Sequence, residues 1–449
     1  MNTPVCDFVR AYAARDPVRM HMPGHKGKTL TGPEATDLTE IGGADVLYAS
    51  GGIIRQSEEN AASLFGAART VYSAEGSSLC IRAMLYLALL TAKEKGLPPR
   101  LLAGRNAHRT LMTAAALLGL ETDWLLPAPG ADMLSCASDP GILEKKLEEQ
   151  PYMAVYLTSP DYLGRSADLR GAAEACRRHG VPLLVDNAHG AYLKFLPEDR
   201  HPISLGADAC CDSAHKTLSC LTGAAYLHLS ENAPEGWAER AEQAMSLFAS
   251  TSPSYLVLQS LDRMNAALAG DYPDRISRAA ERAADLRETL SREGWAFAGD
   301  EPMKLTLDAA GYGYTGEDLQ GILRRSGIEC EFADRRYLVL MPSAETTEEE
   351  WRRLYSALRG IPRKEPLAEK VPALPVPERV TGIREAMLAP RETLPVEQAV
   401  GRVLADACVA CPPAVPVIAA GERVTEAAAA CMRHYGVTEC DVVQEAGLR

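Results

Sequence analysis

The chain has 449 residues, of which 47% are hydrophobic and 24% charged, proportions typical of a globular protein with two or three domains. Its formal net charge of −13 argues against a nucleic-acid-binding protein, which would carry a basic face. The N-terminus lacks the apolar core of a signal peptide, and no apolar run reaches membrane-spanning length. We therefore expect a cytoplasmic protein that binds neither nucleic acid nor membrane.

The twelve cysteines are scattered, and most of them lie inside apolar runs, as Cys80, Cys176 and Cys220 do. Cys408 and Cys411 form a Cys-x-x-Cys pair, but no second pair or histidine set completes a zinc site in the sequence. Buried structural thiols explain these cysteines better than metal or redox chemistry does. We expect no metal ion.

The first elements in chain order are a helix and an irregular segment. Residues 2–19 carry apolar side chains at helical spacing, which predicts a short amphipathic helix. In residues 20–28, Pro23, Gly24 and Gly27 oppose regular structure, and two histidines stand beside two lysines. This segment is either a solvated basic loop or an arm that reaches an active site, its own or that of a second subunit. Composition favours neither.

A phosphate-binding turn is predicted where a strand meets a long helix. Residues 70–74 form a brief strand, the turn Glu75-Gly76-Ser77-Ser78 follows, and residues 79–92 form an apolar helix. Backbone N–H groups and hydroxyls at a helix N-terminus bind anions, and the helix dipole favours negative charge there. Serines at this position also serve as ordinary helix caps, so the turn alone does not establish a phosphate site.

Two apolar runs lead into groups that suit a cofactor. Residues 181–185 are followed by Asp186-Asn187-Ala188-His189-Gly190, and residues 208–212 by Ser213-Ala214-His215-Lys216. Each run predicts a buried parallel strand with polar groups at its carboxyl end, where open α/β sheets bind ligands. A carboxylate and a lysine on neighbouring strand ends can hold pyridoxal phosphate. The deprotonated lysine forms a Schiff base with the aldehyde, and the carboxylate pairs with the pyridinium nitrogen.

His108 follows another predicted strand, residues 101–104, and should lie at the same rim of the sheet as Asp186 and Lys216. Further strands at 154–158 and 223–229 alternate with helices. This alternation predicts an α/β fold with a doubly wound, mostly parallel sheet.

The second half of the chain predicts smaller parts. Helical patterns at 255–267 and 275–293 precede strands at 304–307 and 337–340 and a helix at 348–358, and a proline-punctuated linker spans 361–377. The expected domains are an N-terminal helix and arm at 1–30, a cofactor-binding large domain at 31–274, a small α/β domain at 275–365, and a C-terminal domain at 366–449.

With these residues in view, the chain resembles the ornithine/lysine/arginine decarboxylase family of fold-type-I pyridoxal phosphate enzymes. The resemblance runs from Pro23-Gly24-His25-Lys26-Gly27 to Gly421-Glu422, and it matches the compact form without an N-terminal wing domain. It implies an aminotransferase-like large domain, a small α+β domain and a C-terminal domain. It also implies a homodimer or higher homo-oligomer with shared active sites that decarboxylates lysine, arginine or ornithine to the amine and carbon dioxide.

Carried over residue by residue, the resemblance assigns roles to this chain. Lys216 would hold the cofactor, and Lys216 or His108 would return the proton that completes the reaction. Thr251 and Ser252 match a segment that reaches the phosphate across the dimer interface, and Glu422 would approach the distal cation of the substrate. The other cofactor contacts would be Ser77, Ser78, Ser213 and His215 at the phosphate, His108 stacked on the ring, Asp186 at the ring nitrogen, and Ala188 and His189 beside the ring.

The chain departs from the family pattern at Glu75, where relatives usually carry Asn, at Asn187, where they often carry Glu, and in residues 159–164. None of these departures removes a group that the chemistry needs. Lys26 is the rival for the cofactor lysine because it also follows a histidine, but no strand precedes it. An aminotransferase or lyase on the same fold is the alternative enzyme, because the cofactor residues are common to all of them. A non-catalytic relative is a further alternative, which the complete set of cofactor residues disfavours.

Overall fold

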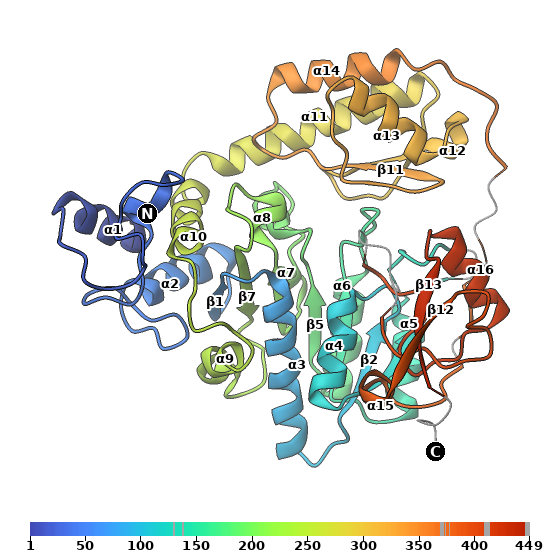
Figure 1. Ribbon diagram of the computed structural model, residues 1–449, viewed down its shortest axis with the longest axis horizontal. Coiled ribbons are helices and arrows are strands. Elements are labelled where there is room, and N and C mark those ends of the chain that lie inside the picture. The colour runs from blue at the N-terminus through green and yellow to red at the C-terminus, as the bar shows by residue number, and fades with distance from the viewer. Residues whose placement is uncertain are drawn as a thin grey trace. The chain divides into compact units, whose positions relative to one another are not determined.

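A computed structural model of the chain describes residues 1–128, 131–136, 139–368, 372, 374–376, 378–407 and 414–444. The chain divides into two compact units, whose helices and strands are labelled in Figure 1. The first unit contains Met1–Leu97, Met153–Val155 and Leu169–Ser277, and the second contains Pro98–Tyr152, Tyr156–Asp168 and Arg278–Arg449. Cys408 and Cys411, whose pairing the sequence raised, lie outside the described residues.

The first unit is built on four neighbouring strands, which are, in order, β1 (Arg69–Ser73), β7 (Ala225–Leu229), β6 (Ala209–Asp212) and β5 (Leu183–Asp186). β5 and β6 run parallel, whereas β7 is antiparallel to both of its neighbours. Every residue of these strands is buried, as expected for short apolar runs covered on both faces. Because β5 and β6 are parallel, their last residues, Asp186 and Asp212, lie at the same edge of the sheet.

Helices complete the first unit. α3 (Ser77–Glu94) packs against β6, β7 and α9 (Trp237–Ser246). A second group, α1 (Pro4–Ala14), α2 (Ile53–Phe65) and α10 (Tyr255–Leu268), packs together through apolar faces. The remaining helical elements are η1 (Pro33–Thr36), α6 (Leu169–His179), η2 (Ala191–Phe195), α7 (Pro202–Leu205) and α8 (Ala214–Thr217).

The N-terminal helix is shorter than the sequence predicted. α1 ends at Ala14, so the expectation of a helix over residues 2–19 was wrong beyond that point. Asp16 has a left-handed φ of 45° and precedes Pro17, and a residue before proline is sterically driven out of the helical region. The predicted apolar face is confirmed, because Val5 and Val9 are buried.

The second unit begins with a parallel strand pair. β2 (Arg100–Gly104) pairs with β3 (Glu121–Leu125), and α4 (Arg109–Leu118) connects them. α5 (Pro140–Glu149) precedes β4 (Ala154–Thr158), and the full strand order of the central sheet is β1-β7-β6-β5-β4-β2-β3. The predicted α/β fold with a mostly parallel sheet is confirmed.

An antiparallel sheet forms another part of the second unit. Its strand order is β10-β11-β9-β8, which confirms the strands predicted at 304–307 and 337–340. Capping boxes at Thr315 and Thr347 begin two of its helices. The elements are the part of α11 (Tyr272–Arg292) that follows Ser277, β8 (Phe297–Ala298), β9 (Leu305–Asp308), α12 (Ala309–Tyr312), α13 (Gly316–Arg325), β10 (Phe332–Ala333), β11 (Tyr337–Leu340) and α14 (Glu348–Arg359).

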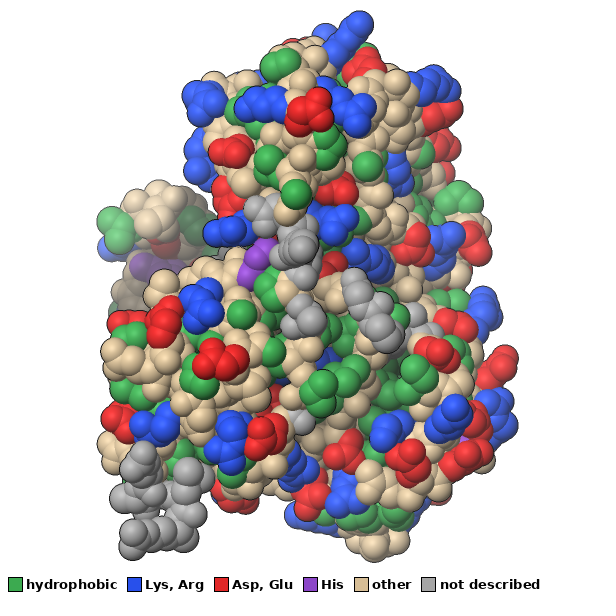
Figure 2. Space-filling view, turned by 90° about the vertical axis from the view of Figure 1, so that its right-hand side faces the viewer, with side chains coloured by type: hydrophobic (Ala, Val, Ile, Leu, Met, Phe, Trp, Pro, Cys, Tyr) green, Lys and Arg blue, Asp and Glu red, His purple; other side chains and the backbone are tan. Residues whose placement is uncertain are grey.

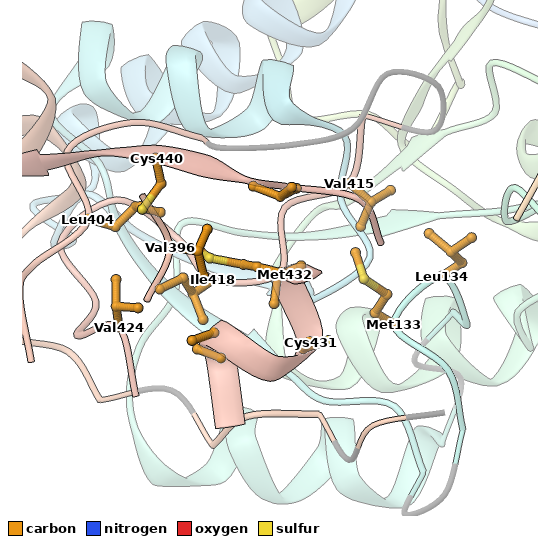
Figure 3. Packing of buried hydrophobic residues seen from close by; sticks show 14 of the residues in the cluster. Met133, Leu134, Val396, Leu404, Val415, Ile418, Val424, Cys431, Met432 and Cys440 are labelled. Atoms are coloured by element: carbon orange, nitrogen blue, oxygen red, sulfur yellow. The ribbon is translucent and has the colours of Figure 1, made fainter. Parts of the chain in front are cut away.

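The C-terminal part of the second unit is an antiparallel ribbon of β12 (Arg391–Pro395) and β13 (Glu439–Val443) with α15 (Ile383–Leu388) and α16 (Glu426–His434). Its apolar side chains form one buried cluster, in which Leu404, Val424 and Met432 are fully buried. Figure 3 shows these side chains turned toward one another, with Met133 and Leu134 at the cluster's edge. The cluster fixes the C-terminal segment against residues of the 98–152 segment.

The ten described cysteines all have free thiols. Most are buried, and burial raises the pKa of both Cys431 and Cys440 to about 11. The prediction of buried structural thiols is therefore confirmed for most of the described cysteines, while Cys220 is only half-buried.

Charged side chains are dispersed on the face drawn in Figure 2, where Lys and Arg stand among Asp and Glu. Exposed ion pairs such as Arg282–Glu348, with 2.8 Å between the nitrogen and the carboxylate oxygen, contribute little to stability. Among the described helices, none combines the length and the apolar character that crossing a membrane requires.

Candidate functional site

The candidate lysine lies just beyond the end of β6. Ser213 is the residue before the short helix α8, and Lys216 lies within that helix with an exposed side chain. The Lys216 Nζ is 3.1 Å from the Nε2 of His189, a residue only 7% exposed. The two segments that the sequence singled out, 186–190 and 213–216, are therefore brought together as predicted.

Asp186 ends β5 and is 3% exposed. Its Oδ1 accepts a hydrogen bond from the backbone N–H of Ala188 at 3.2 Å and one from the Cys211 thiol at 3.6 Å. These contacts hold the carboxylate of Asp186 at the edge of the sheet where Lys216 also lies. Ala188 is half-buried between Asp186 and His189.

The predicted phosphate turn has the expected geometry. Gly76 has a φ of 73°, a left-handed conformation that a side chain would disfavour, and α3 begins at the next residue, Ser77. The N-cap residue of α3 is Gly76, which has no side chain to cap the helix, so N–H groups of the first turn can serve an anion. Ser213 Oγ donates to Ser77 Oγ at 2.8 Å, which joins this turn to the lysine segment, and Ser78 is half-buried beside it.

His215 lies next to the same turn. Its Nδ1 donates to the carbonyl oxygen of Ala224 at 2.8 Å, and its Cε1 is 4.0 Å from the position that a Cβ on Gly76 would occupy. Burial lowers the pKa of His215 below its ordinary value, so the ring is neutral at physiological pH. A neutral ring that donates through Nδ1 keeps Nε2 as an acceptor, which suits a protonated phosphate or a water-mediated contact better than a bare anion.

Glu75, a departure from the family pattern, has a defined structural role. Its Oε1 accepts a hydrogen bond from the backbone N–H of Ser250 at 2.8 Å. This bond ties the phosphate turn to the exposed segment that contains Thr251 and Ser252.

Taken together, the first unit fits pyridoxal phosphate. It brings a reactive amine (Lys216), a buried carboxylate (Asp186) and an uncapped helix N-terminus with two serine hydroxyls into one region. These are the groups required by the aldehyde, the pyridinium nitrogen and the phosphate of this cofactor. Lys26 offers no comparable surroundings, since it follows no strand and its Nζ donates to the backbone oxygen of His21.

His108 and Glu422 belong to the second unit, and their predicted contacts with the cofactor and the substrate stay predictions. His108 is the N-cap of α4, where its Nδ1 accepts from the backbone N–H of Thr110 at 3.2 Å. The stacking and proton-transfer roles predicted for His108 use the face and edge of the ring rather than this nitrogen.

Glu422 is 3% exposed, and both of its carboxylate oxygens are engaged. Oε1 accepts from the indole N–H of Trp124 at 3.1 Å, and Oε2 accepts from the backbone N–H of Ala419 at 2.7 Å. Oε2 also lies 3.5 Å from the guanidinium of Arg105, which itself donates to the carbonyl oxygens of Pro416 and Val417. Within its own chain, Glu422 therefore anchors the C-terminal segment.

Sequence reasoning missed two polar networks, Arg105–Trp124–Glu422 and the one around Asp212. Asp212 is the last residue of β6, just as Asp186 is the last residue of β5. This shared position in the sequence could have marked Asp212 as a candidate functional residue. Its partners His201 and His228 could not be assigned to it from the sequence, because neither lies in a recognisable motif.

Comparison with known proteins gives concordant results. Residues 3–309 match the family described as Orn/Lys/Arg decarboxylase, major domain, and residues 375–440 match Orn/Lys/Arg decarboxylase, C-terminal domain. An arginine decarboxylase of Halalkalibacterium halodurans is 31% identical over 96% of this chain and 93% of its own length. An arginine decarboxylase of Bacillus subtilis is 30% identical over 95% of this chain and 92% of its own length.

Solved structures support the fold. The constitutive lysine decarboxylase of Escherichia coli superposes with a TM-score of 0.79 at 18% identity and covers 99% of this chain and 82% of that one. The ureidoglycine-glyoxylate aminotransferase of Bacillus subtilis superposes with a TM-score of 0.54 at 16% identity over 68% of this chain and 83% of that one. The large-domain fold is thus one that decarboxylases and aminotransferases share.

Proposed function

Because the chain belongs to the Orn/Lys/Arg decarboxylase family, we propose that it is a pyridoxal-phosphate-dependent decarboxylase of a basic amino acid, with arginine as the first candidate substrate. The observation that carries the proposal is the clustering, in one unit, of Lys216, His189, Asp186 and the Ser77–Ser213 pair. Arginine comes first because relatives that match nearly the whole chain are named arginine decarboxylases.

When bound, the cofactor supplies an electron sink for the pair of electrons that the departing carboxylate leaves on the substrate's Cα. The carboxylate of Asp186 would pair with the ring nitrogen and favour its protonated form, since opposite charges at close range stabilise each other. Ser77, Ser78 and Ser213 would hold the phosphate and thereby orient the ring.

Lys216 would hold the cofactor through its Nζ, and the Nε2 of His189, 3.1 Å away, would provide a hydrogen-bond partner for that nitrogen. Lys216 or His108 would supply the proton that the substrate's Cα receives after carbon dioxide has left.

Selection of the substrate's distal cation by Glu422 is part of the proposal, but it requires the cation to compete with contacts that Glu422 already makes to Arg105, Trp124 and Ala419. We also propose a cytoplasmic homodimer with shared active sites. In such a dimer the exposed segment with Thr251 and Ser252 would contact the phosphate of the other subunit.

The proposal is tested by incubating the purified protein and pyridoxal phosphate separately with arginine, lysine and ornithine. Carbon dioxide and the corresponding amine are both measured. One substrate that gives equal amounts of the two products is the expected result, with arginine the fastest. Keto-acid formation without carbon dioxide would point instead to an aminotransferase, and failure to bind the cofactor would point to a non-catalytic relative.

A further inference from the structure

A buried polar network lies directly behind the segment that carries Asp186 and His189. At its centre is Asp212, whose Oδ1 accepts a hydrogen bond from the side-chain amide of Asn187 at 2.6 Å. The other oxygen, Oδ2, is 2.9 Å from His201 Nε2 and 3.4 Å from His228 Nε2. Asp212, Asn187, His201 and His228 are all fully buried, with 0% exposure.

The network keeps a negative charge in the interior. Burial alone would raise the pKa of Asp212, but His201 and His228 outweigh it and hold that pKa below its ordinary range. His228 is itself oriented by Thr70, whose hydroxyl lies 2.8 Å from the Nδ1 of the ring. A buried charge with hydrogen bonds on both oxygens has little freedom to move, because any displacement leaves it without a partner.

Asn187 connects Asp212 to the segment that carries Asp186 and His189. Its backbone N–H donates to the carbonyl of Cys211 at 3.0 Å, and its carbonyl accepts from the N–H of Gly190 at 2.8 Å. A Cβ on Gly190 would lie 2.0 Å from the Asn187 side-chain oxygen, so the backbone of Gly190 closes tightly over the amide. Asn187 is thus held at its backbone and at its side chain, between Asp186 and His189.

We propose that Asp212 is a positioning residue for cofactor binding, which acts through Asn187 to fix the Asp186–His189 segment. The inference rests on the proposed function and deepens it. Asn187 supplies the donor that an ionised Asp212 requires. A carboxylate at residue 187 would place two like charges in contact and would push the segment away from the sheet edge.

A double-mutant cycle tests the proposal. The variants are Asp212→Ala, Asp212→Asn, Asn187→Asp and the double exchange of Asn187→Asp with Asp212→Asn. The dissociation constant of pyridoxal phosphate and the absorption maximum of the bound cofactor are measured for each apo-protein. Far-ultraviolet circular dichroism identifies any variant that fails to fold. Neither binding readout depends on decarboxylation.

Loss of the hydrogen bond between Asn187 and Asp212 should weaken cofactor binding by about tenfold or more in Asp212→Ala, and contact between two carboxylates should do the same in Asn187→Asp. Asp212→Asn keeps an acceptor for Asn187 and should stay within about threefold of wild type. The double exchange restores a donor–acceptor pair and should recover most of the affinity that Asn187→Asp loses. If Asp212→Ala fails to fold, the proposal is still tested by comparing the cofactor affinity of Asn187→Asp with that of the double exchange.

Equal affinity in all variants, or a double exchange no better than Asn187→Asp, would overturn the proposal while leaving the proposed function intact. If the wild type itself fails to bind the cofactor, the proposed function fails first. His201, Cys210 and Asp212 each offer a ligand atom within 4.8 Å of the others, so metal content is measured in parallel. Stoichiometric metal that Cys210→Ser removes would also overturn the proposal, because Asp212 would then be a metal ligand.

Discussion

Replacement of Glu422 by alanine should destabilise the protein by about 3–5 kcal/mol, the cost of removing one partner of a buried ion pair. The structure gives the reason. Arg105, whose side chain is 6% exposed, would keep its buried guanidinium without the carboxylate 3.5 Å away. The indole N–H of Trp124 and the backbone N–H of Ala419 would each lose an acceptor as well. Glu422→Gln keeps one acceptor oxygen and should cost less, about 1–3 kcal/mol.

The free energy of unfolding is measured by urea denaturation followed by tryptophan fluorescence, for both variants and the wild type. Glu392→Ala is the matched control. Glu392 forms an ion pair with Arg402 at 2.7 Å in the same C-terminal segment, but Glu392 is 42% exposed, so its loss should cost less than about 1 kcal/mol. The reasoning is refuted if Glu422→Ala costs no more than Glu392→Ala. It is also refuted if Glu422→Gln raises the KM for the amino acid at unchanged stability, because Glu422 would then serve the substrate alone.

Three further predictions concern cofactor affinity, pH dependence and packing. Ser213→Ala should weaken pyridoxal phosphate binding roughly tenfold, by loss of a hydrogen bond to a charged group, as titration of the apo-protein will show. Burial raises the pKa of Asp208 to about 6, above its unfolded value, so Asp208 stabilises the fold at low pH and this contribution is lost as pH rises toward 6. As pH rises from about 4 to about 7, Asp208→Asn should therefore become more stable relative to wild type, as urea titrations of both proteins at each pH will show. A stability difference that does not change with pH would contradict the raised pKa of Asp208. Leu404→Ala in the buried C-terminal cluster should lower the free energy of unfolding by about 2–5 kcal/mol. Leu388→Ala, at a side chain 69% exposed, should change it by no more than about 0.5 kcal/mol. Equal losses of stability in the two variants would contradict the packing of Leu404.

The sequence allowed the cofactor residues to be predicted where a local pattern marks them. Asp186 and Lys216 follow apolar runs that form adjacent parallel strands, and Ser77 begins a helix after a glycine turn. Parallel strands align their carboxyl ends, so neighbouring runs predict neighbouring functional groups without any knowledge of side-chain contacts.

Contacts between distant parts of the chain could not be predicted in this way. Trp124 and Glu422 are 298 residues apart, and no local periodicity shows that their side chains meet. The ribbon of β12 and β13 also went unpredicted, because the residues of β12 are mostly exposed and form no apolar run. The end of α1 was missed although the sequence marks it, because Pro17 restricts the backbone of Asp16 and the apolar helical spacing ends at Tyr12.

The measurement that tests the central claim most directly is reduction of the protein–cofactor complex with borohydride, followed by proteolysis and mass spectrometry of the peptides. Reduction fixes the cofactor on the lysine that carries it. We predict a pyridoxyl group on Lys216 in stoichiometric yield and none on Lys26. Labelling of Lys26 or of another lysine, or no labelling at all, would contradict the assignment of the cofactor site to the edge of the sheet formed by β5 and β6.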